Sequence, residues 1–156
     1  MTIGEVCTRK VIIATRDTSI YEAARLMREH HVGDLVVTEE FGDRRSPVGI
    51  VTDRDIVVEI LAEGFSPEGL TVDEIMSDHL ITVKEHDSMF EALRSMRAAG
   101  VRRAPIVDAG GALIGIVSLD DLLELIAEEL GDLANLIREE RRNEEVSRRP
   151  ATSLVH

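Results

Sequence analysis

The sequence predicts a mixed α/β fold made of two copies of one β-α-β-β-α unit. The helical stretch Ser19–Met27 recurs 69 residues later as Ser88–Met96, and the strand Val48–Thr52 recurs as Ile114–Ser118 after a shorter loop. Each copy is too short to bury a good core alone. A tandem repeat of this length therefore predicts two small sheets with their helices, packed face to face with pseudo-two-fold symmetry.

The composition supports a single aliphatic core. The 156 residues are 44% hydrophobic but only 3% aromatic, so the core must consist of Val, Ile, Leu, Ala and Met. The net charge of −12 argues against a surface that wraps DNA or RNA, because such binding depends on Lys and Arg. Cys7 is the only cysteine, which excludes a disulfide within the chain.

The apolar segments also bear on where the protein resides. No N-terminal apolar run resembles a signal peptide, and no stretch reaches the ~18 apolar residues of a membrane span. We therefore expect a cytoplasmic protein with no membrane and no nucleic-acid partner.

Each copy is expected to begin with a short extended segment, at 11–14 and at 80–83, followed by an amphipathic helix. Apolar residues recur at positions i, i+3, i+4 and i+7 from Ile20 in the first copy and from Met89 in the second. This spacing gives each helix one apolar face that can pack on its sheet.

The starts and one end of these helices can be read from capping patterns. Ser19 and Ser88 are each followed three residues later by glutamate, which fits a capping box, although Thr18 and Asp87 are alternative caps. Gly100 can end the second helix in a left-handed conformation.

Two strands and a second helix complete each copy. The strand segments are too continuously apolar to be half exposed, so we expect them to be buried on both faces. The strands are expected at 35–37, 48–51, 104–107 and 113–117, separated by turns at 42–43 and 110–111. The closing helices are expected at 53–62 and 119–130.

These elements predict the organisation of the chain: a first copy at 1–63, a linker at 64–71, a second copy at 72–130 and an extension at 131–156. A short helix is expected at 72–76. Gly131 is expected to break or bend the last helix. A charged, solvated helix should follow and fray into a disordered tail at Pro150–His156.

The residues most able to carry chemistry follow the last strand of each copy, as Thr52-x-x-Asp55 and Ser118-x-x-Asp121. One interpretation is a helix cap. The other is a nucleoside phosphate site, where hydroxyls and a helix N-terminus donate to phosphate and carboxylates accept from ribose. In this second interpretation, the glycine in the preceding strand would let a base approach the backbone.

A second candidate is the pair Arg102–Arg103, whose counterparts in the first copy are Gly33 and Asp34. The pair either forms surface salt bridges or clamps a phosphate with its guanidinium groups. Arg54 could assist from the first copy.

Other reactive residues give no site. The spacing of His30, His31, His79, His86 and Cys7 is not that of metal ligands. No paired carboxylates and no nucleophile–histidine arrangement indicate catalysis. The chain is therefore not expected to be an enzyme or to hold a metal.

The motifs, taken together, resemble a CBS-domain pair, also called a Bateman module. The resemblance covers about residues 6–130 and is carried by four stretches: Val-Gly-Asp-Leu-Val-Val at 32–37, Gly-Ile-Val-Thr-Asp-Arg-Asp at 49–55, Gly-Val-Arg-Arg-Ala-Pro-Ile-Val-Asp at 100–108 and Gly-Ile-Val-Ser-Leu-Asp-Asp at 115–121. It implies a cleft that holds up to two adenosyl ligands, such as AMP, ADP, ATP, S-adenosylmethionine or NAD-type molecules.

The resemblance also implies roles for individual residues. Thr52 and Ser118 would lie near phosphates, Asp55 and Asp121 near ribose hydroxyls, and Arg102 and Arg103 at a phosphate contact. Val32, Val101, Ala104 and the strand near Thr15 would line adenine pockets, and Arg54, Asp120, Gly33 and Pro105 complete the candidate ligand-binding set. Because Asp34 replaces an arginine in the first copy, we expect two unequal sites.

Two functions remain open from the sequence. The first is a regulatory module, typically a homodimer, that senses an adenine nucleotide and changes the activity of a protein partner, with no cofactor required. The alternative is a dimerisation or partner-binding scaffold with an empty cleft. In that case an apolar stripe at Leu130, Leu133, Ala134 and Ile137 would dock on a partner or on the dimer mate.

Overall fold

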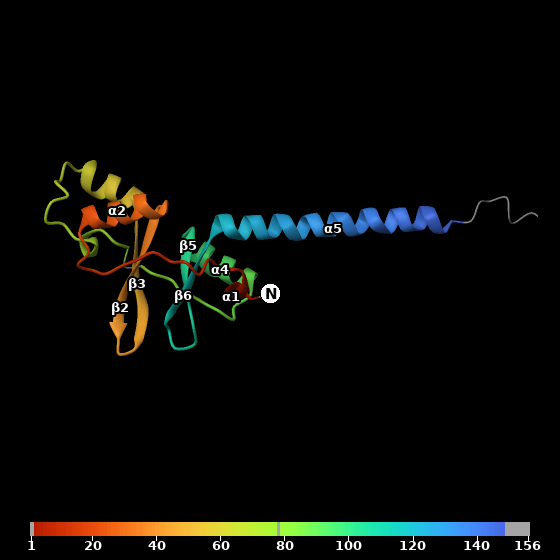
Figure 1. The fold of residues 1–156 in the computed structure, drawn as a ribbon, viewed down its shortest axis with the longest axis horizontal. Coiled ribbons are helices and arrows are strands. Elements are labelled where there is room, and N and C mark those ends of the chain that lie inside the picture. Colours follow the sequence, from red (N-terminus) through yellow and green to blue (C-terminus); the bar gives the residue numbers. More distant parts are fainter. Residues whose placement is uncertain (1, 78, 149–156) are drawn as a thin grey trace, which may run out of the picture. The chain divides into compact units, whose positions relative to one another are not determined.

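The computed structural model describes residues 2–77 and 79–148 (Figure 1). Its elements, in chain order, are α1 (Ile3–Val6), β1 (Ile13–Ala14), α2 (Ile20–His30), β2 (Asp34–Phe41), β3 (Arg44–Thr52), α3 (Asp53–Asp55), η1 (Ile56–Leu61), η2 (Val72–Glu74), β4 (Val83–Lys84), α4 (Met89–Ala99), β5 (Arg103–Val107), β6 (Leu113–Ser118) and α5 (Leu119–Ser147).

The strands form two sheets with the same topology, which confirms the predicted mixed α/β fold. Sheet 1 has the order β1-β2-β3 and sheet 2 the order β4-β5-β6. In each sheet the first pairing is parallel and the second is an antiparallel hairpin. Both hairpins carry a register shift at the equivalent place, between Val37 and Thr38 and between Ile106 and Val107.

The core is aliphatic, as the composition predicts. Leu35, Val37 and Val51 of sheet 1 have no exposed surface, and they pack in one cluster with Ile20 of α2 and Ile60 of η1. At about 25 cal/mol per Å², burial of such side chains is the main favourable contribution to folding. Of the apolar face predicted for α2, Ile20, Ala23 and Met27 pack in this cluster, whereas Ala24 is exposed.

The first residues of each copy attach to the other copy. Near the N-terminus, the Ile3 N–H donates to the Asp87 carbonyl at 2.8 Å, and Thr8 bridges to Ile116 of β6. Between the copies, the Val72 N–H donates to the Thr18 carbonyl at 2.9 Å, and the Ser77 N–H to the Ile50 carbonyl at 3.0 Å. The two halves are therefore interlocked by backbone hydrogen bonds.

These crossing segments overturn our interpretation of the strand glycines. A Cβ on Gly49 would lie 2.7 Å from the Met76 sulfur, and a Cβ on Gly115 would lie 2.7 Å from the Cys7 sulfur. The expectation that these glycines admit a base was wrong. They admit the neighbouring protein segment, because only glycine tolerates so close an approach.

The helix caps follow the predicted pattern. The Ser19 hydroxyl accepts from the Glu22 N–H at 3.1 Å, so Ser19 rather than Thr18 is the cap of α2. Ser88 and Glu91 form a complete capping box on α4, and the bond from the Ser88 N–H holds the pKa of Glu91 below its ordinary value. Gly100 ends α4 with φ 68°, as expected.

The closing helix of the first copy is wound differently from the expected α-helix. Only α3 is α-helical, and η1 continues it as a π-helix. The wider winding is seen in the bond from the Ala62 N–H to the Val57 carbonyl, five residues back, at 2.8 Å.

The second closing helix runs from Leu119 to Ser147 without interruption, so the expected break at Gly131 was wrong. The helix formers around this glycine outweigh a cost of about 1 kcal/mol. Among the described residues, 120–148 form a compact unit of their own. The predicted tail at 150–156 lies outside the described residues.

Within 2–77 and 79–148, none of the helices combines the length and apolar character needed to cross a bilayer. The cytoplasmic location stays a prediction from the sequence.

Candidate functional site

The polar candidates gather where each sheet meets its closing helix. In sheet 1, Asp34 at the start of β2 pairs in register with Thr52 at the end of β3. In sheet 2, Arg103 at the start of β5 pairs in the same way with Ser118 at the end of β6. Directly paired residues of antiparallel strands have Cα atoms about 4.5–5.5 Å apart.

Two equivalent backbone bonds hold the helix starts against these strands. The Asp53 N–H donates to the Gly33 carbonyl at 3.0 Å, and the Leu119 N–H donates to the Arg102 carbonyl at 2.8 Å. The repeat therefore builds the same scaffold twice, with a hydroxyl residue and a helix start beside the first residue of a strand.

An ion pair joins the two scaffolds. The Arg103 Nε lies 3.1 Å from the Asp34 Oδ1, and the two residues occupy equivalent positions in the two copies. The Asp34 side chain is 16% exposed and that of Arg103 is 39% exposed, so this pair is more shielded than a typical surface salt bridge. We call the surrounding group the inter-sheet site; its members are Gly33, Asp34, Thr52, Asp53, Arg102, Arg103 and Ser118.

The site has a marked electrostatic asymmetry. Burial raises the pKa of Asp34; Arg103 opposes this shift, and the neighbouring carboxylate of Asp53 reinforces it. Asp53 was not singled out from the sequence. Its carboxylate lies 3.2 Å from where a Cβ on Gly33 would be, so a side chain there would push the carboxylate slightly aside. The only signal in the sequence was a carboxylate directly after the hydroxyl residue.

The cap interpretation is confirmed for Thr52 and Asp55. The Asp55 N–H donates to the Thr52 hydroxyl oxygen at 3.1 Å, and the Thr52 N–H donates to the Asp55 Oδ2 at 2.8 Å. Both residues are half-buried. A ribose hydroxyl bound at Asp55 would therefore share its carboxylate with the cap.

The remaining candidates differ in accessibility. Arg54 is exposed on α3, whereas Ala104 and Pro105 are buried in β5 and present little surface to a ligand. Val32 and Val101 are half-buried, and each N–H donates to a carbonyl in the last turn of the preceding helix. Val32 also packs against the core of sheet 1.

Asp120 and Asp121 belong to the first turn of α5, in the separately described unit. Asp120 is exposed and Asp121 is half-buried, and each makes an interaction with another group. Their proposed ligand contacts stay predictions.

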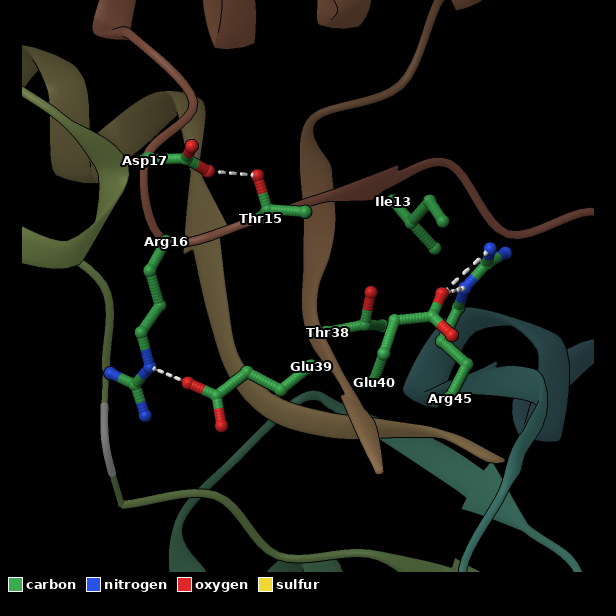
Figure 2. Close-up of a pocket in the computed structure, with 8 residues that line it drawn as sticks. All are labelled: Ile13, Thr15, Arg16, Asp17, Thr38, Glu39, Glu40 and Arg45. Atoms are coloured by element: carbon green, nitrogen blue, oxygen red, sulfur yellow. Dashed lines mark hydrogen bonds and ion pairs between the residues drawn. The ribbon is translucent and has the colours of Figure 1, made fainter. Parts of the chain in front are cut away.

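Thr15 follows β1, which pairs with the middle of β2, so it lies away from the Asp34 end of that strand. The strand pairing places Ala14 beside Val37, three residues along β2, which is about 10 Å at 3.3 Å per residue. Figure 2 shows Thr15 in a pocket of about 330 Å³, together with Ile13, Arg16, Asp17, Thr38, Glu39, Glu40 and Arg45.

Both arginines of this pocket are already paired with carboxylates. Arg16 pairs with Glu39 and Arg45 pairs with Glu40 (Figure 2). Arg16 also pairs with Asp73, outside the pocket lining. No combination of hydroxyl, helix start and arginine occurs among its lining residues, so the pocket does not reproduce the predicted nucleotide constellation. Across the described part of the chain, no group of three or more His, Cys, Asp or Glu side chains could hold a metal ion.

Two interlocked copies of a small α/β unit, with polar strand ends joined across the two sheets, define the class of tandem-repeat α/β proteins. The family model of the CBS domain matches residues 3–62 and 72–128. The chain belongs to the CBS domain family, and the resemblance read from the sequence is confirmed. Proteins with this pair of domains are generally regulatory and non-catalytic.

Relatives in several organisms share the pair. The Methanopyrus kandleri protein MK0525 is 39% identical over 125 residues, covering 80% of this chain and 62% of MK0525. The chain therefore spans less than two thirds of that relative. The Bacillus subtilis CBS domain-containing protein YhcV is 37% identical over 121 residues, covering 77% of this chain and 81% of YhcV.

Solved structures agree with the fold. The CBS domain pair of protein MJ0100, in complex with 5′-methylthioadenosine and S-adenosyl-L-methionine, is similar with a TM-score of 0.71 and 27% identity, covering 83% of this chain and 98% of that one. A hexameric CBS-CP12 protein from bloom-forming cyanobacteria is similar with a TM-score of 0.68 and 30% identity, covering 79% of this chain and 66% of that one.

Proposed function

We propose that this protein is a regulatory, non-catalytic module that binds an adenosyl ligand at the inter-sheet site and transmits its occupancy to a protein partner. The observation that carries the proposal is the pairing of Asp34 with Arg103, each of which lies in register with a hydroxyl residue, Thr52 in sheet 1 and Ser118 in sheet 2. The adenosyl ligands bound by the similar MJ0100 pair support this ligand class.

The chemistry of the site suits such a ligand. Hydroxyls from Thr52 and Ser118 can donate to or accept from polar groups of the ligand, and the carboxylates of Asp53 and Asp55 can accept from ribose hydroxyls. Because the site draws on both sheets, a ligand that favours one arrangement of the two halves shifts the population toward it. The shift is limited by the difference in affinity for the two arrangements.

Thermal melts test the proposal on the full chain. A ligand present at about 100 times its Kd should stabilise the fold by about 2.7 kcal/mol. We expect stabilisation by 5′-methylthioadenosine, S-adenosylmethionine or an adenine nucleotide, and a loss of that stabilisation in Thr52→Val and Ser118→Ala. No shift with any of these compounds at millimolar concentration would contradict the proposal.

The chain offers a matched control for the loss of a cap. Thr71 caps η2 in a capping box with Glu74, as Thr52 caps α3 with Asp55, but it lies outside the inter-sheet site. Thr71→Val should lower the melting temperature of the unliganded protein as Thr52→Val does, and should leave the ligand-induced shift intact.

A second function, self-association through α5, is favoured by an exposed apolar stripe. Leu123, Ile126, Leu130, Leu133 and Ile137 alternate in steps of three and four residues, the spacing of a coiled-coil seam. Leu130 and Leu133 are 61% and 59% exposed. A second copy of this chain would cover the stripe with an identical one, which forms a homodimer.

Charge favours an antiparallel pair of helices. The first half of α5 carries only acidic charges, at Asp120, Asp121, Glu124, Glu128, Glu129 and Asp132. The later half carries Arg138, Arg141 and Arg142 together with four glutamates, so it is close to neutral. Antiparallel pairing sets the acidic half of each helix against the nearly neutral half of the other, whereas parallel pairing sets two acidic halves side by side.

Sedimentation analysis separates this second function from the first. Leu130→Lys with Leu133→Lys should convert dimers to monomers, because a charge in the seam must be desolvated on pairing. Val146→Lys is the control, since Val146 is 82% exposed and lies outside the stripe. A dimer that persists in the double variant would exclude the stripe as the interface.

A further inference from the structure

Arg103, one of the two arginines of the inter-sheet site, is already paired with a carboxylate of the protein. The Arg103 Nε is 3.1 Å from a carboxylate oxygen of Asp34, which comes from the other sheet. A phosphate that bound Arg103 would have to compete with this carboxylate, and the displaced charge of Asp34 would remain beside it.

The surroundings of Asp34 strengthen this effect. The Asp34 side chain is only 16% exposed, so water screens its charge less than that of a surface residue. Asp53 is close enough to raise the pKa of Asp34 further, which shows that the two carboxylates interact electrostatically. An incoming phosphate dianion would therefore meet like charge from the first copy.

We propose that Asp34 makes the inter-sheet site selective for adenosyl ligands whose 5′ substituent carries no phosphate, that is, for neutral thioethers or cationic sulfonium derivatives. The inference rests on the proposed function and deepens it by naming the ligand class. Specificity arises here from repulsion of the wrong ligand as much as from attraction of the right one.

The equivalent positions explain why the selectivity applies to the site as a whole. A repeat with arginine at both positions would offer phosphate contacts in each copy, whereas this chain has Asp34 in one copy and Arg103 in the other. Because the two side chains pair with each other, the aspartate both removes one contact and occupies the second. A neutral or cationic 5′ group leaves this ion pair undisturbed.

Isothermal titration calorimetry of the full chain with 5′-methylthioadenosine and with AMP tests the proposal. The two compounds share adenosine and differ only at the 5′ position. For the wild type we expect 5′-methylthioadenosine to bind at least about tenfold more tightly than AMP. Asp34→Asn should strengthen AMP binding about tenfold and change 5′-methylthioadenosine binding by less than about threefold.

Asp73→Asn is the matched control. Asp73 pairs with Arg16 at 2.6 Å, away from the inter-sheet site, and its loss should leave the ratio of the two affinities unchanged. Asp34→Ala is a second variant in case Asp34→Asn does not fold, and the wild-type ratio needs no variant at all.

The outcomes separate this inference from the proposed function. If the wild type binds AMP as tightly as 5′-methylthioadenosine, or if both Asp34 variants keep the wild-type ratio, the selectivity is overturned while adenosyl binding stands. If neither compound nor S-adenosylmethionine binds, the proposed function fails and the selectivity fails with it.

Discussion

The two copies of the repeat share one scaffold but differ in the residues where their middle strands, β2 and β5, begin. Each copy places a hydroxyl residue at the end of a strand and holds the following helix by an equivalent backbone bond. The residues that begin the middle strands are Gly33 and Asp34 in one copy and Arg102 and Arg103 in the other.

This difference teaches which positions the fold demands and which it leaves variable. Caps, strand glycines and buried aliphatic residues recur because they satisfy backbone groups or fill the core. The residues where β2 and β5 begin are not constrained in this way, and Asp34 and Arg103 there carry opposite charges that pair across the two sheets.

The largest difference inside the core is at Leu35 and its equivalent Ala104, both of which have no exposed surface. Leu35→Ala makes the first copy resemble the second and should lower the free energy of unfolding by about 3 kcal/mol, because it leaves a cavity. Denaturant unfolding measures the change. Leu136→Ala, at a side chain that is 63% exposed, is the control and should cost little.

The strand glycines should respond unequally to an added methyl group. Gly115→Ala should cost about 2 kcal/mol, because its Cβ would clash with Cys7, a short side chain with little freedom to move away. The Cβ of Gly49→Ala would meet the Ser77 carbonyl oxygen at 3.0 Å, much as that of Gly115→Ala would meet the Thr8 carbonyl at 3.1 Å. Its other close neighbour is the flexible Met76 side chain, which can move away, so the cost should be smaller, about 1 kcal/mol.

A double-mutant cycle sharpens this second prediction. Cys7→Ala combined with Gly115→Ala should recover part of the loss, since it removes the sulfur 2.7 Å from the new Cβ. Strictly additive effects would show that the clash does not involve Cys7.

The glutamates behind the helix caps should differ by a smaller amount. Glu91→Ala removes the carboxylate that accepts from the Ser88 N–H at the start of α4. It should cost about twice as much stability as Glu22→Ala, which removes an exposed ion pair with Arg25. Thermal unfolding of both variants checks the order. Equal or reversed costs would mean that the glutamate half of the capping box on α4 contributes nothing.

The smallest expected effect is a pH dependence that only the first copy shows. Burial raises the pKa of Asp34 in the folded state above the ordinary value of about 3.9. The contribution of Asp34 to stability is thus fully present below about pH 4 and declines as the pH rises through the raised pKa.

Unfolding curves of wild type and Asp34→Asn, recorded from acid to neutral pH, measure this contribution. Relative to Asp34→Asn, the wild type should lose stability as the pH rises through that window. A relative gain over the same window would mean that the pairing with Arg103 outweighs burial, and would reverse the sign of the shift.

Much of the fold could be predicted because its signals are local. The capping serines, the apolar periodicity of α2 and α4 and the left-handed Gly100 each depend on a few neighbouring residues, and the repeat doubled the first two of these signals. The expected break at Gly131 failed because a single glycine is a weak signal inside a run of strong helix formers.

The candidate site was only partly predictable, because its key contacts join distant parts of the chain. The sequence indicated Thr52, Ser118 and Arg103, but nothing local shows that Arg103 pairs with Asp34. The glycines in β3 and β6 were misinterpreted for the same reason. Gly49 contacts residues 76–77 and Gly115 contacts residues 7–8, and in both cases these segments belong to the other copy of the repeat.

The most direct test of the account is to map a bound ligand onto the amides of the full chain by NMR. Titration with 5′-methylthioadenosine should shift the amide signals of both copies together, those of Gly33, Asp34 and Thr52 along with those of Arg102, Arg103 and Ser118. Shifts confined to one copy, or centred on the pocket around Thr15 and Thr38, would contradict a site shared by the two sheets.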